Sequence, residues 1–263
     1  IRVQIWRIQI FQLHKMSFTR IISRLDIKGN NLVKGINLEG LRKVGNPIEL
    51  ASKYYKENID EIIYVDAVAS LYRKNTLSNL IYETSKKIFV PLTVGGGIRS
   101  IDNIRELLLA GADKVSINTA AVKDMSFVKK ASKKFGTQCM VVAVDAKKVS
   151  ESKWEIFTHG GREKTGIDAI DFTKKAEANG AGEILLTSMD KDGTKSGYDL
   201  ELLNIITKSV NIPVIASGGA GTLDHLYDAI KTGGASAVLA ASIFHYGEFT
   251  IKDTKEYLKS KNI

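Results

Sequence analysis

Two aspartates stand at the ends of apolar segments, and they are the residues of this chain best suited to chemistry. Asp26 closes RIISRLD and Asp145 closes CMVVAVD, and lysines follow at Lys28 and Lys147. Either aspartate alone has an ordinary explanation, because a carboxylate at a strand end often caps a loop or pairs with a lysine. Two carboxylates that face one ligand can act as general acid and general base, since neighbouring charges move their pKa values apart. We therefore predict a catalytic role for both.

Glycine-rich segments at the ends of other apolar runs predict anion binding. VGGG ends at Gly97 and SINTAA follows it, while SGGAG begins at Ser217 and AAS at Ala240. Where such a segment opens a helix, unpaired backbone N–H groups and the helix dipole favour a phosphate. Glycines also serve simply to turn tight loops. Because the chain has two equivalent sets, phosphate binding is the better account, and a site on each side suits a ligand with a phosphate at both ends.

The segment TSMDKDGT (187–194) supplies further polar candidates, which we expect to order a loop or to contact the substrate: Thr187, Asp190, Asp192 and Gly193. The four histidines show no metal-ligand spacing and none ends a predicted strand, so we expect no metal and no cofactor, and place all four at the surface or in loops: His14, His159, His225 and His245.

The elements that must position these residues alternate regularly along the chain. Short β-branched runs without strict polar alternation are typical of strands covered on both faces in a parallel sheet. Amphipathic helical segments separate them, for example SIDNIRELLLAGA, with Ser100 as N-cap and Gly111 as the stop. Eight strands are predicted, at 20–25, 61–65, 90–94, 114–117, 140–144, 183–186, 213–216 and 237–240.

The chain also matches itself at an offset of 122 positions. EIIYVDA, from Glu61, lies over EILLTSM, from Glu183, and VPLTVGGGI lies over IPVIASGGA. Asp26 and Asp145 fall close to the same register. These features predict one α/β domain, a single (β/α)8 TIM barrel built from two homologous (β/α)4 halves at about 16–135 and 136–263. A doubly wound open sheet is the alternative, although it would need neither eight even units nor equivalent halves.

Bulk composition narrows the function classes. The net charge of +9 is spread over lysines along the whole chain, with no basic block interleaved with aromatic residues, so we exclude nucleic acid. No apolar run approaches the roughly 18 residues of a membrane helix, and we expect no membrane association. The single cysteine, Cys139, lies in an apolar, strand-like run and cannot form an intrachain disulfide. A reducing, cytoplasmic location is expected.

The first 15 residues differ from the rest of the chain. IRVQIWRIQIFQLHK alternates apolar and polar residues, has no small-residue cleavage site and precedes Met16. We predict that residues 1–15 are an extension outside the fold and not a signal peptide. The barrel is then expected to span residues 16–263.

Longer segments carry a more specific pattern: RLDIKGNNLVKG, VDAVAS, PLTVGGGIRS, GADKVSINTAAV, VVAVDAKK, GAGEILLTSMDKDGTKSGYD, IPVIASGGAG and LAASIFH. From about Thr19 to the C-terminus, the chain resembles the cyclase subunits of imidazole glycerol phosphate synthase, a family of histidine biosynthesis. The resemblance implies that ammonia reacts with a bis-phosphorylated phosphoribulosyl-formimino aminoimidazole carboxamide ribonucleotide. The products would be imidazole glycerol phosphate and aminoimidazole carboxamide ribonucleotide.

The resemblance also implies a role for individual residues and a partner. Asp26 and Asp145 match the acid/base pair, and Lys34 matches a mobile lysine of the first loop. One phosphate would be held by Gly97, Asn118 and Thr119, and the other by Ser217, Gly219, Ala241 and Ser242. A glutaminase subunit would dock on the N-terminal face and send ammonia through the barrel, past a gate of charged residues formed by Arg20, Glu61, Lys114 and Glu183. Such charges inside a barrel are costly unless they pair.

Several positions depart from the family pattern. Arg24 stands where a small residue or cysteine is usual, GNN occupies 29–31 in the first loop, GNP replaces GDP at 45–47, and Phe172 replaces a common tryptophan. We expect the Arg24 charge either to depress the pKa of Asp26 or to bind a different anionic substrate.

Three alternatives follow. Second copies of this family in surface-polysaccharide pathways pass ammonia to a sugar and form an amidino group, and Arg24 with the altered loop favours that function. The sugar-phosphate isomerase of the same pathway has a similar barrel, but it needs no ammonia channel, and the charge gate and DKDGTKSGYD speak against it. A binding module without catalysis is disfavoured by the two facing carboxylates.

Overall fold

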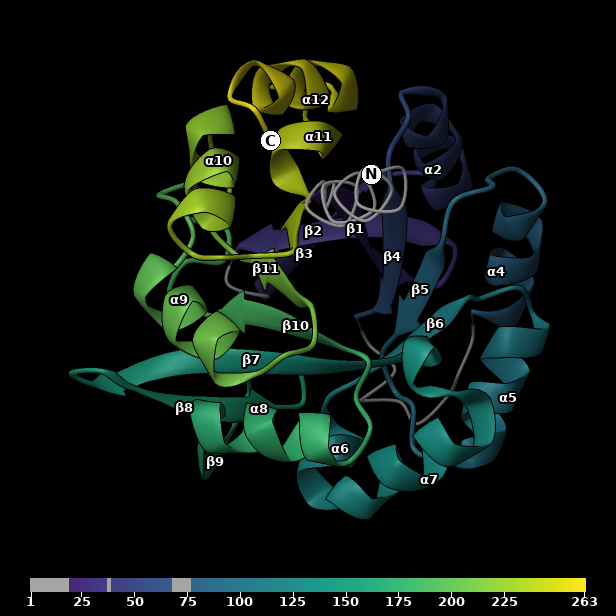
Figure 1. The fold of residues 1–263 in the computed structure, drawn as a ribbon. Helices are drawn as coiled ribbons and strands as arrows, with labels where there is room; N and C mark the ends of the chain where they lie inside the picture. The colour runs from purple at the N-terminus through teal and green to yellow at the C-terminus, as the bar shows by residue number, and fades with distance from the viewer. Residues whose placement is uncertain (1–18, 37–38, 68–76) are drawn as a thin grey trace, which may run out of the picture.

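The computed structural model describes residues 19–36, 39–67 and 77–263, which form a barrel of parallel strands wrapped by helices (Figure 1). The predicted extension 1–15 lies outside the described residues. In chain order the barrel strands are β1 (Arg20–Lys28), β4 (Glu61–Asp66), β5 (Leu92–Gly95), β6 (Lys114–Ile117), β7 (Met140–Ser150), β10 (Glu183–Ser188), β11 (Val214–Ser217) and β12 (Ala237–Ala240). Each predicted strand overlaps one of these.

Neighbouring strands pair in parallel all the way round the barrel. β12 pairs with β1, and β7 pairs with β10, so the sheet closes on itself. This closure confirms the predicted (β/α)8 TIM barrel. The doubly wound open sheet is wrong, because that architecture leaves two edge strands unpaired.

Helices connect consecutive barrel strands and cover the outside of the sheet (Figure 1). Ser100 Oγ accepts a hydrogen bond from the Asn103 backbone N–H at 3.1 Å, which confirms the predicted N-cap of α5. The helices are α2 (Pro47–Lys56), α4 (Ser78–Ser85), α5 (Ile101–Leu109), α6 (Thr119–Lys123), α7 (Met125–Phe135), α8 (Ala169–Ala178), α9 (Leu200–Ser209), α10 (Leu223–Lys231), α11 (Ser242–His245) and α12 (Ile251–Ser260), with a 3-10 turn η1 (Thr137–Cys139).

Two apolar cores stabilise the barrel. The larger lies between the strands and the helices, and includes Phe172, the position where the family more often has tryptophan. The smaller fills the inside of the barrel and contains Ile22, Ile63, Val141, Leu185, Ile215, Ala237 and Leu239. Side chains alternate across a strand, so on β1 the residues Arg20, Arg24 and Asp26 share the inner face with Ile22. The inner core therefore separates the two charged ends of the barrel.

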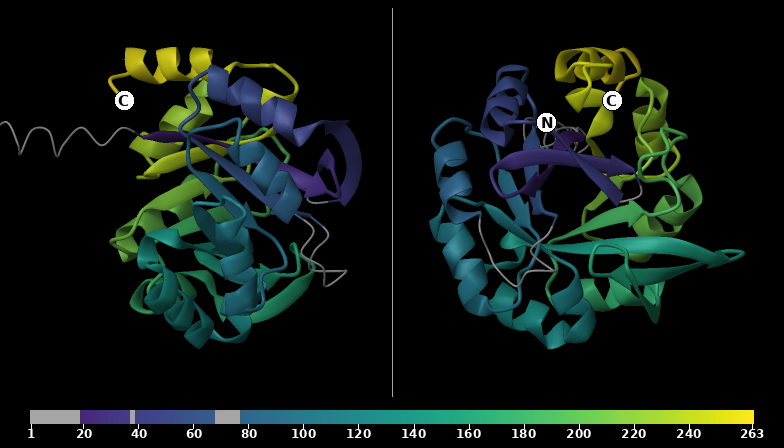
Figure 2. Two further views of the ribbon diagram at one scale, coloured as in Figure 1. Left: turned by 90° about the vertical axis from the view of Figure 1, so that its right-hand side faces the viewer. Right: turned by 180° about the vertical axis from the view of Figure 1, so that it is seen from behind.

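Two antiparallel extensions were not predicted from the sequence. Beyond the barrel, β1 pairs with β2 (Asn31–Ile36), which pairs with β3 (Glu39–Gly45), and β7 pairs with β8 (Lys153–Thr158), which pairs with β9 (Glu163–Asp168). Because they continue from the C-terminal ends of β1 and β7, both lie at the same end of the barrel (Figure 2).

Close backbone contacts support the equivalence of the two halves. Gly96 has φ +97°, and a Cβ there would lie 2.5 Å from the Asp66 carbonyl oxygen. Its counterpart Gly218 has φ +92°, and a Cβ there would lie 2.7 Å from the Ser188 carbonyl oxygen. Asp66 and Ser188 are themselves 122 positions apart. The same steric constraint thus selects glycine at the same place in each half.

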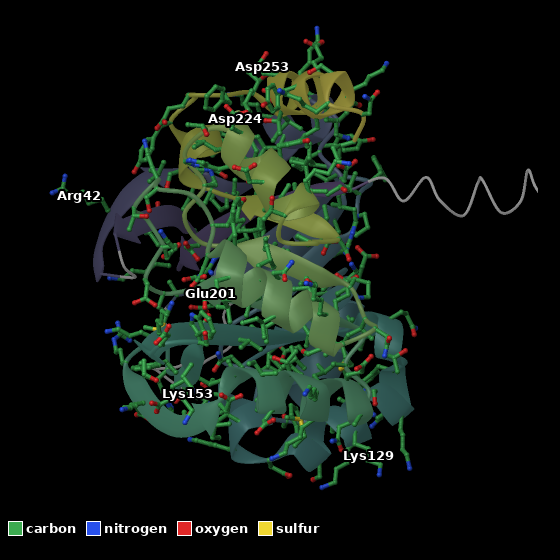
Figure 3. The ribbon with its side chains drawn as sticks, turned by 60° about the vertical axis from the view of Figure 1, so that its left-hand side comes forward. Arg42, Lys129, Lys153, Glu201, Asp224 and Asp253 are labelled. Atoms are coloured by element: carbon green, nitrogen blue, oxygen red, sulfur yellow. The ribbon has the colours of Figure 1, made fainter. Side chains whose placement is uncertain are left out.

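The outer surface carries the scattered charge that the sequence suggests, with side chains such as Lys129, Lys153, Glu201 and Asp224 facing outward (Figure 3). Among the described residues, no helix combines the length and the apolar character needed to cross a membrane. Cys139 differs from its prediction: it closes η1 directly before β7, half-buried, and its thiol donates to the Phe135 carbonyl oxygen at 3.3 Å.

Candidate active site

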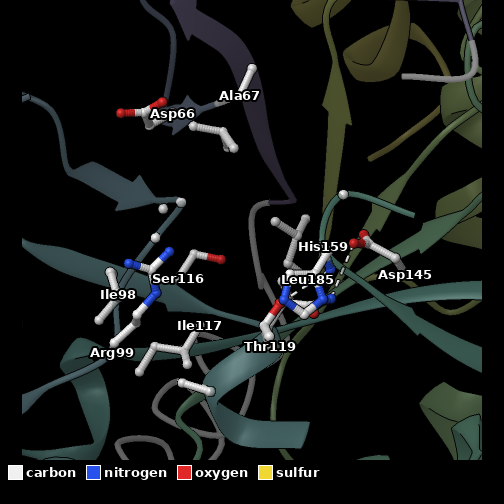
Figure 4. A pocket seen from close by; sticks show the side chains of 18 of the residues that line it. Asp66, Ala67, Ile98, Arg99, Ser116, Ile117, Thr119, Asp145, His159 and Leu185 are labelled. Atoms are coloured by element: carbon white, nitrogen blue, oxygen red, sulfur yellow. Dashed lines mark hydrogen bonds between the residues drawn. The ribbon is translucent and has the colours of Figure 1, made fainter. Parts of the chain in front are cut away.

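A cavity of about 410 Å³ opens at the C-terminal ends of the barrel strands. Six neighbouring strands contribute residues to it, and each of these residues stands near or just after the C-terminal end of the part of its strand that pairs within the barrel: Asp26, Asp66, Gly97, Asn118, Asp145 and Thr187. In Figure 4, Asp145, Thr119 and His159 lie close together, with Asp66 across the cavity from them. The structure thus brings the two aspartates predicted to be catalytic onto one cavity.

Asp145 is held by a neutral donor. Asn118 Nδ2 donates to Asp145 Oδ2 at 3.1 Å. Burial raises the pKa of Asp145 to about 6, with Asp192 and Asp26 adding to the shift and the Arg24 guanidinium opposing it. A carboxyl with this pKa is protonated for part of the time near neutral pH, so it can deliver a proton.

Asp26 is held by a charged donor. Arg24 Nε donates to Asp26 Oδ1 at 2.8 Å, and their side chains are only 14% and 7% exposed. Burial opposes the charge of Arg24, but Asp26, Asp192 and Asp145 outweigh it and raise the pKa of the guanidinium. The contact between Arg24 and Asp26 agrees with their predicted proximity, whereas the expected effect on the pKa of Asp26 stays a prediction.

The backbone of Arg24 is fixed by a histidine that the sequence analysis placed at the surface or in a loop. The β1–β12 ladder ends at the pair Ser23 and Ala240, so the Arg24 carbonyl lies beyond it. His245 Nε2 lies 3.0 Å from that carbonyl oxygen, and His245 Nδ1 lies 2.8 Å from the Tyr54 hydroxyl. The surface assignment is wrong for His245, whose half-buried ring links α2, α11 and β1.

The first predicted phosphate set lies on the cavity. Gly97 has φ +70°, and Asn118 and Thr119 follow β6 at the start of α6. The amide of Asn118 is turned to Asp145, so its side chain does not cap the first N–H groups of α6. Thr119 Oγ1 accepts from the His159 backbone N–H at 3.2 Å.

Basic side chains that the sequence analysis did not place at the site also line this cavity: Arg99, Lys123 and Arg162, together with His159. His159 lies in the turn directly after β8, which agrees with its expected loop position, but its place at the end of a strand was missed. The error arose because β8 and β9 were not predicted. The segment THGGR, with glycines at 160 and 161 of positive φ, was the available signal for a turn at the cavity rim.

The second predicted phosphate set does not line the 410 Å³ cavity. Ser217 borders a separate space of about 10 Å³, and Gly219 has φ +104° where a Cβ would lie 2.1 Å from the Gly197 carbonyl oxygen. Ala241 and Ser242 open α11, which like α6 has no side-chain N-cap. The start of α11 thus resembles the start of α6 in the first phosphate set, but only the first set lines the 410 Å³ cavity.

The remaining predicted contacts are placed as follows. Thr187 lines the cavity, and its buried hydroxyl has no hydrogen-bond partner within the described part of the chain. Asp192 lies in the turn after β10, where its backbone N–H donates to the Ser188 carbonyl oxygen at 3.0 Å. Gly193 follows with φ +76°. Lys34 lies on β2.

The four predicted gate residues form one ion cluster at the opposite end of the barrel. Each is the first residue of its strand: Arg20, Glu61, Lys114 and Glu183. Arg20 contacts Glu61 at 2.6 Å and Glu183 at 2.9 Å, and Lys114 contacts the same two carboxylates at 2.9 and 2.8 Å. Thr93 Oγ1 also donates to Glu61 at 2.6 Å. Two cations and two anions thus satisfy one another at the start of the barrel.

Known proteins match this chain over most of its length. Residues 20–250 match the family described as "Histidine biosynthesis protein". A curated relative, "Imidazole glycerol phosphate synthase subunit HisF" of Endomicrobium trichonymphae, is 59% identical over 244 residues, which cover 93% of this chain and 94% of the relative. A closed (β/α)8 barrel with a polar C-terminal mouth agrees with that match. The chain belongs to the histidine biosynthesis protein family.

Proposed function

We propose that this protein is an ammonia-dependent cyclase that forms imidazole glycerol phosphate and aminoimidazole carboxamide ribonucleotide from the phosphoribulosyl-formimino precursor. The single observation that carries the proposal is the placement of Asp26 and Asp145 on one cavity, each with a different hydrogen-bond donor. The relative named as a subunit of imidazole glycerol phosphate synthase supports the substrate class.

The two carboxyls suit the proton transfers of ring closure. When ammonia forms carbon–nitrogen bonds, its nitrogen must lose protons to a base, and the departing oxygen and nitrogen groups must gain protons from an acid. Asp145, with its pKa raised to about 6, can supply a proton near neutral pH. Asp26, paired with a guanidinium, can accept one. The orphan hydroxyl of Thr187 would contact the substrate between them.

A bis-phosphorylated substrate would lie across the mouth of the barrel. Gly97, Asn118 and Thr119 would hold one phosphate, and the cationic side chains of Arg99, Lys123 and Arg162 would add charge complementarity on that side. The other phosphate would be held by Ser217, Gly219, Ala241 and Ser242. Lys34, Asp192 and Gly193 would contribute contacts from neighbouring loops.

Ammonia would come from a glutaminase subunit bound at the N-terminal face. The relative's name describes a subunit of a synthase, which supports a complex. The ion cluster of Arg20, Glu61, Lys114 and Glu183 would serve as the gate between the partner and the inner core. We place the reaction in the cytoplasm, where the lone thiol of Cys139 stays reduced.

A direct assay tests the proposal. The purified chain, given the phosphoribulosyl-formimino precursor and an ammonium salt, should release both products without a glutaminase. No turnover of the precursor by folded protein would contradict the proposal.

One observation favours a second candidate function. Arg24 adds a buried cation beside Asp26, where the middle of the substrate would lie. A family member that passes ammonia to an anionic sugar, and forms an amidino group, could use this charge for substrate binding. In the same assay such an enzyme would fail on the imidazole precursor and consume ammonia only with the sugar.

A further inference from the structure

We propose that Arg24 is a positioning residue: it holds Asp26 ionised and in one orientation, so that the proton shared by the two carboxyls resides on Asp145. This inference rests on the proposed function for its catalytic consequence. The ionisation states themselves can be measured without turnover.

The argument begins with the geometry of the two carboxyls. Arg24 and Asp26 are two residues apart on β1, so both side chains project into the barrel, and Nε donates to Oδ1 at 2.8 Å. Asp145 receives its hydrogen bond from the neutral amide of Asn118 at 3.1 Å. A hydrogen bond from a cation is roughly twice as strong as one from a neutral donor. The ionised form is therefore favoured more strongly at Asp26 than at Asp145.

Arg24 is held at its backbone carbonyl as well as at its guanidinium. Its carbonyl oxygen lies 3.0 Å from His245 Nε2, and the Tyr54 hydroxyl holds the other ring nitrogen of His245 at 2.8 Å. Burial of this tyrosine raises its pKa, so it stays neutral, and its hydroxyl can donate to Nδ1. This arrangement assigns the Nε2 proton to the bond with the Arg24 carbonyl. The guanidinium thus starts from a backbone position that is itself anchored.

The charges around the pair support the same distribution of protons. Burial raises the pKa of Asp145, and Arg24 lowers it, while Asp192, in the turn after β10, and Asp26 raise it further. Asp66, Arg99 and His159 line the same cavity from other elements. Both carboxyls line one cavity and the charge of Asp26 raises the pKa of Asp145, so a fixed cation on Asp26 helps to decide which carboxyl keeps a proton.

Carboxyl-carbon NMR of protein labelled at aspartate tests this directly, with the signals of the pair assigned through Asp26→Asn and Asp145→Asn. In the wild type, Asp145 should titrate near pH 6 and Asp26 at least one unit lower, about tenfold in ionisation constant. In Arg24→Gln, the midpoint of Asp26 should rise by about one unit or more. In Arg24→Lys, Asp26 should still titrate below Asp145, as in the wild type. Arg42→Gln, at an exposed position, is the control for losing one positive charge.

Activity gives an independent readout. The ratio of Arg24→Gln to wild-type kcat/KM, measured with ammonium at matched pH, should fall about twofold between pH 8 and pH 6, because an Asp26 midpoint raised by about one unit leaves roughly half of this carboxyl protonated at pH 6. A raised KM with an unchanged pH profile would overturn the proposal in favour of direct substrate binding by Arg24. A lowered Tm with an unchanged profile would reduce Arg24 to a structural residue.

Failure of this proposal is distinguishable from failure of the proposed function. If the wild type does not turn over the imidazole precursor, the NMR titration still decides the role of Arg24. If Arg24→Gln does not fold, the wild type and Arg24→Lys remain: an Asp26 that titrates above Asp145 in either protein would overturn the assignment.

Discussion

Asp26 and Asp145 are the same side chain at equivalent strand ends, but the barrel surrounds them differently. Asp26 is paired with the Arg24 guanidinium at 2.8 Å. Asp145 accepts a hydrogen bond from the Asn118 amide, and its carboxyl is largely desolvated. Desolvation disfavours the charged form, and a nearby cation favours it. At the residue scale, the proposed division into base and acid therefore follows from environment, and it has a cost in stability.

Because of that cost, replacing Asp145 should increase the free energy of unfolding by an amount that depends on pH. Its folded pKa of about 6 exceeds the ordinary 3.8, so the native state binds the proton more tightly than the unfolded state. Asp145 therefore destabilises the native state increasingly as pH rises from about 4, and fully above about 6. Asp145→Asn should raise the free energy of unfolding by up to about 3 kcal/mol at pH 8 and by little at pH 4. Urea denaturation at both pH values measures it, and a pH-independent difference would contradict it.

At the scale of elements, the starts of four strands are joined through one ion cluster centred on a buried carboxylate. Glu61 is fully buried and accepts from Arg20, Lys114 and Thr93. Removing one member of a buried cluster leaves charge uncompensated, which costs far more than breaking a surface pair.

Glu61→Gln should therefore lower the free energy of unfolding by about 3 kcal/mol. The exposed pair of Glu201 and Lys148 supplies the matched control, since Glu201→Gln should change stability little. In a complex with the glutaminase, Glu61→Gln should also reduce glutamine-dependent turnover more than ammonium-dependent turnover. Equal losses with both donors would remove the gate role.

A second prediction at this scale concerns the stability contributed by the glycines that follow β5 and β11. Gly96→Ala and Gly218→Ala should each destabilise the barrel by about 2 kcal/mol or more, because a Cβ meets a carbonyl oxygen at a backbone conformation that L-residues avoid. Gly160→Ala, with φ +67° and no atom within 4 Å of the added Cβ, isolates the conformational cost. Thermal unfolding that ranked Gly160→Ala as the most harmful would contradict this account.

The barrel could be predicted from the sequence because its strands are short, buried and evenly spaced, and because the two halves repeat. The antiparallel extensions could not, although they occupy corresponding places in the two halves, since their strands mix charged and apolar residues and do not form short apolar runs like those of the barrel. β9 carries exposed charges such as Glu163 and Lys164, which give no apolar pattern to detect. Cys139 was placed in a strand-like run because it is continuous in sequence with the apolar residues of β7, whereas in the structure it closes η1.

The site was predictable to the extent that it lies at barrel strand ends. Asp26 and Asp145 follow from the topology alone, because equivalent strand ends must face one mouth. His159 and Arg162 could not be predicted to line the cavity, since they depend on β8 and β9. The anchoring of Arg24 by His245 depends on where β12 stops, which a sequence pattern does not specify to the residue.

For the whole molecule, the proposed function predicts stabilisation by phosphate ligands. A bis-phosphorylated substrate analogue at about 100 times its Kd should stabilise the protein by about 2.7 kcal/mol, and inorganic phosphate should act weakly in the same direction. Arg162→Gln, in the turn between β8 and β9 at the cavity, should reduce this shift more than Lys153→Gln, which removes an exposed lysine at the start of β8. Differential scanning fluorimetry measures it, and equal shifts in both variants would place the phosphates elsewhere.

The central claim is that Asp26 and Asp145 together perform the proton transfers of ring closure, and the rates of their asparagine variants test it most directly. With the phosphoribulosyl-formimino precursor and ammonium salt, Asp26→Asn and Asp145→Asn should each lower kcat by about 100-fold or more while both proteins remain folded. Near-normal turnover in either folded variant would contradict the claim.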